Sequence, residues 1–248
     1  MAVGLTLPEV LNQITGKTTS FFEPTVDYCV FKICRFTFEK FPEAQRVINT
    51  SMKAVGEAMS IGRNFKEALQ KGIRSTETGR FGLGSDGKDI FSDEVLESAT
   101  EDLIKRVKEK IRIPNDERLF FIRYGIKLGL SVDEIYELSK IDRWFIDNMM
   151  QIVELEKEIK KYRGKNAKSE IRIPPELLKK AKKNGFSDKQ VACLINSTEK
   201  RVRSYRKKCN IKAVYKLVDT CGGEFKASKP YYYSTYETKD ESHPSGNK

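Results

Sequence analysis

The pattern of apolar and polar positions divides the chain into a short mixed region and a long helical one. Residues 28–36 (YCVFKICRF) are rich in β-forming side chains and predict a largely buried strand. Residues 52–62 (MKAVGEAMSIG) predict a second strand, although their alanines and methionines would equally suit a helix. Apolar residues then recur at helical spacing from 65 to 73, behind Asn64 as N-cap and Glu67 at the capping-box position.

Turn-forming residues predict where other helices begin and end. Thr6 and Glu9 are spaced as a capping box, which predicts a short helix over residues 6–14. Gly82, Gly84 and Gly87 follow a helical pattern rather than a strand, so they predict a helix stop and a linker instead of a phosphate-binding loop. Neither a GxxxxGK[ST] loop nor a strand-borne GxGxxG is present.

Residues 90–212 predict helices throughout and contain an internal duplication. Residues 129–138 (GLSVDEIYEL) align with residues 185–194 (GFSDKQVACL) at an offset of 56. In each copy a glycine ends one helix in a left-handed turn, and a serine caps the next with Glu or Gln three residues later. Each copy therefore encodes a sharp helix–turn–helix corner, with Leu130 or Phe186 packed beneath it. Further caps are expected at Asp142 and Thr198.

The basic charge of the chain is confined to one region. The 248 residues include 46 Lys and Arg against 35 Asp and Glu, a net charge of +11. Residues 157–212 hold 19 basic and 5 acidic residues, so everything else sums to −3. A basic helix after a turn, as in residues 198–208, is typical of DNA-binding proteins. The helix after the first corner, residues 143–156, is apolar and acidic, which favours packing or assembly over nucleic-acid binding.

Residue content also excludes several kinds of site. His243 is the sole histidine and lies in a polar C-terminal run, so catalysis through an imidazole is not expected. The five cysteines include no CxxC pair, which predicts neither a metal site nor a disulfide framework. No apolar run reaches the ~18–20 residues of a bilayer span, and residues 1–10 lack signal-peptide features. We therefore expect a cytoplasmic protein that has no membrane partner and no catalytic residue.

Glu57 is the first candidate for a functional role, because it interrupts an apolar strand. A carboxylate there must be paired or hydrated, and Lys53 is the candidate partner. The adjacent Gly56 permits close approach of backbone or ligand. Residue patterns alone favour a satisfied structural charge and leave a cavity-lining or tunnel residue as the alternative.

Aromatic residues supply the remaining candidates. Trp144, Phe145 and Met149 lie on the helix predicted from residue 143, where they form either core or a subunit interface. Four tyrosines crowd into six residues near the C-terminus and predict a contact surface for a partner or a further domain. They are Tyr231, Tyr232, Tyr233 and Tyr236.

Several longer motifs, taken in order, resemble the large subunit of carbamoyl-phosphate synthase from about Gly4 to Glu237. Two positions depart from the family pattern. Cys34 stands where proline is usual, and Gly222–Gly223 replaces alanines, so the backbone is less rigid at both. The motifs that carry the resemblance are FEPTVDY (22–28), KICRF (32–36), FEKF (38–41), MKAVGEAMSIGR (52–63), IDRWF (141–145), VYKLVDTC (214–221) and YSTYE (233–237).

The resemblance implies an α+β fold, mostly α. Residues 1–83 would form a small mixed α/β remnant of the first ATP-grasp domain, the carboxyphosphate domain. Residues 84–225 would form an all-helical oligomerisation domain, and residues 226–248 a linker toward the second ATP-grasp half. The stretch containing Lys53, Gly56 and Glu57 would then lie near the passage that carries carbamate, which favours tunnel lining for these residues.

The implied activity is that of an ATP-dependent ligase, which makes carbamoyl phosphate from bicarbonate, glutamine-derived ammonia and ATP for arginine and pyrimidine synthesis. The family's ATP and Mg²⁺ or Mn²⁺ ligands have no counterpart in the sequence, so we expect a structural segment that binds no cofactor by itself. Expected partners are the rest of the large subunit, a small glutaminase subunit and further copies of the chain. An autonomous basic nucleic-acid-binding module of helix-turn-helix type is the alternative, and a complete enzyme would need ATP-site residues that are missing.

Overall fold

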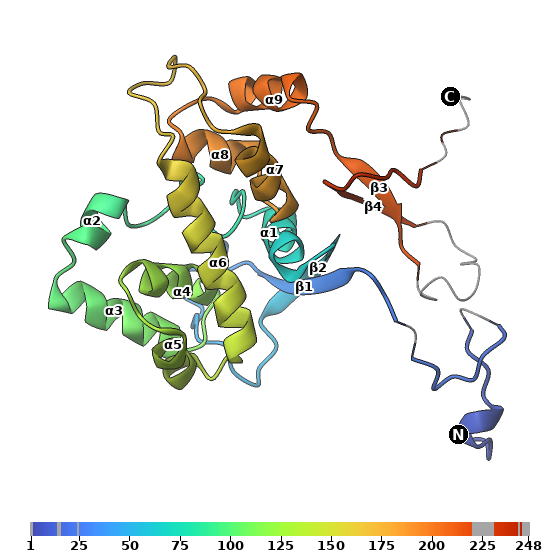
Figure 1. The fold of residues 1–248 in the computed structure, drawn as a ribbon. Helices are drawn as coiled ribbons and strands as arrows, with labels where there is room; N and C mark the ends of the chain where they lie inside the picture. The colour runs from blue at the N-terminus through green and yellow to red at the C-terminus, as the bar shows by residue number, and fades with distance from the viewer. Residues whose placement is uncertain (1, 14–15, 24, 220–230, 243, 245–248) are drawn as a thin grey trace.

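Helices dominate the part of the chain that the structure describes, and two small antiparallel sheets accompany them (Figure 1). The computed structural model describes residues 2–13, 16–23, 25–219, 231–242 and 244. Over these residues the architecture is α+β and mostly helical, as predicted from the sequence. Both the N-terminal segment and the second sheet extend to one side of the helical body (Figure 1).

The first sheet consists of β1 (Cys29–Phe36) and β2 (Ala54–Gly62), which confirms both predicted strands. They pair antiparallel from Cys29 opposite Gly62 onward. One face packs on α1 (Phe65–Ser75), where the rings of Phe31 and Phe65 lie 5.8 Å apart. The other face is exposed at Val30, Lys32, Val55 and Met59. The expectation of a largely buried strand is therefore wrong, because the described residues cover only one face of the sheet.

Asn64 caps α1 as predicted, since its side-chain oxygen accepts a hydrogen bond from the Glu67 amide at 2.9 Å. Glu67 does not complete the expected capping box with Asn64. Its carboxylate turns inward and accepts hydrogen bonds from the Arg63 amide and the Thr235 hydroxyl, each at 2.9 Å. Burial of this carboxylate, which is 1% exposed, makes it a long-range anchor instead of a local cap.

The helix predicted over residues 6–14 is wrong in extent. The structure forms a single 3₁₀ turn, Leu7–Glu9, in which the Glu9 carboxylate accepts a hydrogen bond from the Thr6 amide at 2.7 Å. Val10 is already extended, and Leu11 pairs with Thr19 in an isolated bridge. The capping box therefore closes one turn only, because no buried face supports a longer helix.

Residues 93–208 form eight helices joined by loops, as the hydrophobic periodicity predicts, and the longest loop spans residues 161–174. The longest helix, α6, runs through the centre of the body (Figure 1), and its residues Ile146, Ile152, Val153 and Ile159 are fully buried. Helix α6 spans Arg143–Lys160. The other helices of this range are α2 (Asp93–Glu97), α3 (Glu101–Arg112), α4 (Arg118–Lys127), α5 (Val132–Ser139), α7 (Pro175–Lys183), α8 (Asp188–Leu194) and α9 (Glu199–Lys208).

Both predicted corners are present. Gly129 and Gly185 have φ of +90° and +83°, and each begins a turn that leads into a serine-capped helix with a complete capping box. The apolar residues that follow these glycines are buried, as expected. The repeat also extends further than the sequence alignment indicates. Lys140 and Asn196, again 56 residues apart, both have left-handed backbones at the ends of α5 and α8.

The segment around Gly82, Gly84 and Gly87 joins α1 to α2 without regular secondary structure, as expected for a linker, but residues 82–84 are packed inside the molecule. Leu83 is fully buried, and the carbonyl of Gly84 accepts a hydrogen bond from Gln190 at 2.9 Å. A Cβ on Gly84 would lie 2.3 Å from the Arg123 guanidinium, so the glycine is needed for close approach. The domain boundary between residues 83 and 84 stays a prediction.

The second sheet pairs β3 (Val214–Leu217) with β4 (Tyr232–Thr235), antiparallel, with Val214 opposite Thr235. Residues after β4 fold back, and the Glu241 amide donates to the Tyr215 carbonyl at 2.8 Å. The predicted linker 226–248 thus contains a paired strand. Its residues 226–230, 243 and 245–248, like Cys221 and Gly222–Gly223, lie outside the described residues.

Candidate functional site

Of the three residues predicted to line a tunnel, Glu57 lies on the open face of the first sheet, Gly56 precedes it in β2, and Lys53 lies just before β2 begins. Glu57 has a side chain that is 54% exposed and forms an ion pair with Lys32 across the strands at 2.6 Å. Lys53 is not its partner, because the Lys53 ammonium donates to the carbonyls of Gln45 and Val47 instead. A Cβ on Gly56 would meet nothing within 4 Å. The described residues leave this face uncovered, so the tunnel role stays a prediction.

The residues predicted as an interface on α6 divide between surface and core. Trp144 and Phe145 are 55% and 42% exposed, whereas Met149 is 2% exposed. The two exposed rings rest on Phe65 at centroid distances of 5.2 and 5.3 Å. The interface prediction is therefore wrong for Met149, which belongs to the core. Met149 lies on the same buried face of α6 as Ile146 and Ile152. Trp144 and Phe145 remain candidates for assembly.

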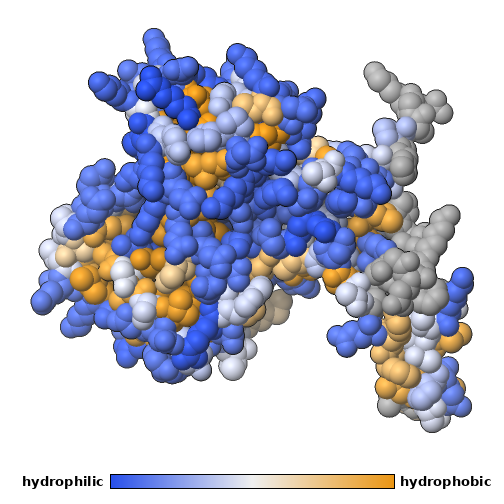
Figure 2. All heavy atoms as spheres, viewed as in Figure 1, coloured by the Kyte–Doolittle hydropathy of each residue, from blue (hydrophilic) through white to orange (hydrophobic). Residues whose placement is uncertain are grey.

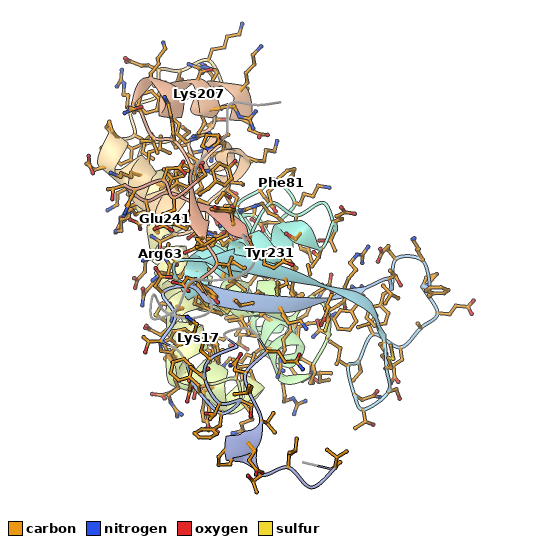
Figure 3. The ribbon with its side chains drawn as sticks, turned by 90° about the vertical axis from the view of Figure 1, so that its right-hand side faces the viewer. Lys17, Arg63, Phe81, Lys207, Tyr231 and Glu241 are labelled. Carbon is orange, nitrogen blue, oxygen red and sulfur yellow. The ribbon has the colours of Figure 1, made fainter. Side chains whose placement is uncertain are left out.

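The tyrosines near the C-terminus are divided in the same way. Tyr231 is 64% exposed, whereas Tyr233 is 6% exposed and accepts a hydrogen bond from Arg63 at 3.4 Å. The ring of Tyr236 lies between Lys182 and Arg206, with 5.1 Å to the ammonium nitrogen and 5.5 Å to the guanidinium carbon. The interface prediction is therefore corrected for Tyr233, which is buried within its own chain, whereas for the partly exposed Tyr236 it stays a prediction. Figure 3 shows Arg63, Tyr231 and Glu241 where the second sheet meets the first.

A buried ion cluster links α4 and α6, and no sequence pattern indicated it. Arg123 and Glu156 are 1% and 2% exposed, and their side chains form a two-pronged pair at 2.8–3.1 Å. Lys127 contacts Glu156 at 3.3 Å and Asp93 at 2.8 Å. Burial acts to raise the pKa of Asp93, but hydrogen bonds from Lys127 and Lys160 outweigh it and hold that pKa well below its ordinary value.

A second buried ion cluster, formed by Lys182, Asp188 and Arg206, lies beside the second corner. Lys182 is 6% exposed and donates to the Phe186 carbonyl at 2.6 Å and to Asp188 at 2.9 Å. Asp188 also accepts hydrogen bonds from Arg206 at 3.2 Å. Burial lowers the pKa of Lys182 to about 8, because the attraction of Asp188 only partly offsets the loss of hydration.

The cleft beside the first buried ion cluster is lined by charges that already pair with one another. This cleft of about 390 Å³ is lined by Asp93, Lys127, Glu156 and Lys160 from that cluster, over the apolar side chains of Leu96 and Leu194. Within the part of the chain that the structure describes, no three His, Cys, Asp or Glu side chains are grouped to hold a metal ion. The two carboxylates of this cleft, Asp93 and Glu156, are already paired with lysine and arginine side chains, so we assign the cleft no catalytic step.

The basic helix α9 presents most of its charge to solvent. Val202 is its buried residue, whereas Lys200, Arg203, Lys207 and Lys208 are exposed. Figure 2 shows many hydrophilic residues, with some hydrophobic ones between them, at the top of the view. Arg201 points back and donates to the Ser169 carbonyl at 2.8 Å, so it helps to hold the preceding loop.

Residues 57–210 match the family model described as the carbamoyl-phosphate synthetase large chain, oligomerisation domain. This match covers more than half of the chain and includes both corners. The chain belongs to this family. The resemblance found from the sequence motifs is thereby confirmed, and the match gives no support to a nucleic-acid-binding module.

Relatives of the family extend the similarity to nearly the whole chain. It is 51% identical over 97% of its length to the carbamoyl phosphate synthase large chain of Archaeoglobus fulgidus, and 47% identical over 97% to that of Nostoc sp.. It is also 48% identical over 97% of its length to the N-terminal section of the large chain of Methanopyrus kandleri.

The chain spans only part of each of these relatives. It corresponds to 21% and 20% of the two large chains, and to 42% of the N-terminal section. The chain is thus similar to one segment of a longer protein. Among its described helices, none is long and apolar enough to cross a membrane.

Proposed function

We propose that this chain is the scaffold segment of a carbamoyl-phosphate synthase large chain, where it joins the catalytic parts of that protein. The observation that carries the proposal is the family match over residues 57–210. That range coincides with the helical body, in whose interior Arg123 pairs with Glu156 and Lys182 with Asp188.

The open face of the first sheet is the surface for the rest of the large chain. A two-stranded sheet is marginal in water unless its faces are covered. Here α1 covers one face, while Val30, Val55 and Met59 remain 45–62% exposed on the other. Residues 1–83 then belong to the first ATP-grasp domain, with Lys53, Gly56 and Glu57 near the carbamate passage.

Trp144 and Phe145, over Phe65, form the surface for a second copy of the chain. Aromatic side chains are enriched at subunit interfaces, where they bury much area at little entropic cost. Both rings are already ordered by contact with Phe65, which lowers that cost further. Tyr231, which is 64% exposed, is a second contact residue.

The whole large chain, on this proposal, is an ATP-dependent ligase with ATP-grasp domains. It uses ATP with Mg²⁺ or Mn²⁺, takes ammonia from a small glutaminase subunit and works in the cytoplasm for arginine and pyrimidine synthesis. The chain by itself neither hydrolyses ATP nor makes carbamoyl phosphate. A metal-dependent ATPase rate in the purified chain, absent from a mock preparation, would contradict the scaffold role.

Sedimentation equilibrium tests the self-association surface, because association depends on protomer concentration. We expect reversible oligomers of the native chain that the double substitution Trp144→Ser and Phe145→Ser converts to monomers with an unchanged helical circular dichroism spectrum. Tyr215→Ser is the matched control, since Tyr215 is an aromatic residue that is 49% exposed on the second sheet. A chain that stays monomeric throughout, or a control that dissociates equally, would refute this surface.

A further inference from the structure

The inward face of β4 is attached to the helical body by polar and aromatic side chains. Tyr233 and Thr235 point inward and are 6% and 2% exposed, whereas Tyr232 and Ser234 point outward. No aliphatic side chain of β4 enters the core, because the strand sequence is Tyr-Tyr-Ser-Thr. The attachment of β4 therefore differs in kind from that of the helices.

One attachment is made to α1. The Thr235 hydroxyl donates to the buried Glu67 carboxylate at 2.9 Å. Lys71 forms an ion pair with the same carboxylate at 2.9 Å, and its ammonium also donates to the carbonyls of Ile61 and Ser234. A single lysine thus links β2, α1 and β4.

A second attachment is made to α7 and α9. The Tyr236 ring lies over both Lys182 and Arg206, and each of these cations also binds Asp188. The next residue, Glu237, forms an ion pair with Lys183 at 3.2 Å. Cation–π contacts of this kind gain strength from partial burial, and they are lost as soon as the ring moves away.

The helical core behind these attachments is held differently. Leu69, Ile73 and Val191 are at most 1% exposed and belong to one continuous cluster of buried apolar side chains. Exposing them would cost the hydrophobic free energy of the whole body. Lifting β4 would instead return Glu67, Lys182 and Arg206 to water, which hydrates the freed charges and offsets part of the lost contact energy.

We propose that residues 231–237, paired with β3, form a strap that docks reversibly on α1, α7 and α9 and opens without unfolding the helical core. Local opening of this kind is expected where buried apolar contacts are few and the attachments are polar. The strap gives the chain a movable joint between its helical body and the residues that follow β4. This inference stands independently of the self-association surface.

Hydrogen exchange of the full chain, read by mass spectrometry at peptide level, tests the strap. In the native chain we expect the β4 amides to exchange faster than those of α6, relative to their intrinsic rates. Tyr236→Leu removes the ring that contacts both cations, and it is expected to speed exchange in β3 and β4 about tenfold while α6 stays unchanged. Tyr236→Phe is the matched control, since it keeps the ring and should leave the rates near native values.

Thr235→Val supplies an independent variant, because it removes the hydrogen bond to Glu67 and keeps the side-chain shape. It should speed exchange in β4 and leave α6 unchanged. Native protection of β4 equal to that of α6 would overturn the proposal, since the strap would then open only with global unfolding. Equal acceleration of β4 and α6 in both variants, or no acceleration in either, would overturn it as well.

Discussion

The two helical corners have the same local geometry in very different surroundings. Gly129 and Gly185 both adopt left-handed backbones, and Ser131 and Ser187 both cap the next helix. A Cβ added to Gly129 would meet nothing within 4 Å, whereas one added to Gly185 would lie 2.8 Å from the Glu67 Cα. Local sequence therefore forms the turn, while packing decides how much the molecule depends on it.

The residues that complete the two capping boxes also differ in burial, and again the second corner is the more closely packed. Glu134 is exposed at the first corner, whereas Gln190 is fully buried at the second. Gln190 donates to the Gln70 side chain at 2.7 Å and to the Gly84 carbonyl at 2.9 Å. The second corner thus joins α1, the segment around Gly84 and α8, and it is the more sensitive of the two.

Substituting the two corner glycines should give the largest contrast. Gly129→Ala is expected to cost about 1–2 kcal/mol from backbone strain at positive φ. Gly185→Ala carries the same strain and also forces α1 away, so we expect a loss of about 3–5 kcal/mol, as for other severe overpacking. Urea unfolding followed by circular dichroism measures both values. Equal losses of unfolding free energy at the two glycines would show that the close packing around Gly185 adds nothing to the cost of its substitution.

Replacing the box residues should give a smaller contrast. Gln190→Ala removes the donor to the buried Gly84 carbonyl and the stronger of two donors to the Gln70 side-chain oxygen, which is expected to cost about 2–3 kcal/mol. Glu134→Ala removes only an exposed cap contact and should cost about 0.5–1 kcal/mol. The same urea titration compares them, and a Glu134→Ala loss as large as that of Gln190→Ala would reverse our ranking of the corners.

The buried Lys182 beside the second corner predicts that the unfolding free energy depends on pH, whereas the first corner has no equivalent lysine. The pKa of Lys182 is lowered to about 8 in the folded chain, so the unfolded chain binds the extra proton between pH 8 and 10.5. The penalty for burying charged Lys182 is present in full below pH 8 and is relieved as pH rises. The unfolding free energy of the native chain should therefore gain on the order of 1–2 kcal/mol relative to Lys182→Met from pH 8 to 10.

Ile126 provides the control for this measurement, because it occupies the position equivalent to Lys182, 56 residues earlier, and carries no charge. Ile126→Met should follow the pH dependence of the native chain. A native chain that loses stability relative to Lys182→Met over this range would mean that the Lys182 pKa is not lowered.

The serine caps should give the smallest contrast. Ser131→Ala and Ser187→Ala each remove a side-chain acceptor for the amide of the third helical residue, at 3.2 and 3.1 Å. Each substitution is expected to cost about 1 kcal/mol, because this contact is local and alike in both copies. Thermal unfolding of the two variants measures it. A much larger loss at Ser187 would show that even the cap depends on the tertiary environment.

Much of the local structure could be predicted from the sequence, because the interactions that form it span three to five residues. The corner glycines, the serine caps and the Asn64 cap all appear where their spacing indicates. Both strands of the first sheet were predicted from their β-forming side chains. Family membership followed from ordered motifs and needed no knowledge of contacts.

The pairing of distant residues could not be predicted in this way. Glu57 binds Lys32 and not the nearby Lys53, since the strand register brings Lys32 beside it. Arg123 on α4 forms an ion pair with Glu156 on α6, and the residue pattern of either helix alone does not predict this pair. The segment predicted as a linker is buried for the same reason, because glycines that suit a turn also suit close packing.

The sequence by itself determined the helices of the body, the corners and the family, because these depend on near neighbours and on the order of motifs. Only the tertiary structure decided which aromatic residues face outward. Trp144 stays exposed while Met149, five residues later, is buried, and Tyr231 is exposed while Tyr233 is not. Burial depends on what other elements cover, and in this chain those elements lie tens of residues away along the sequence.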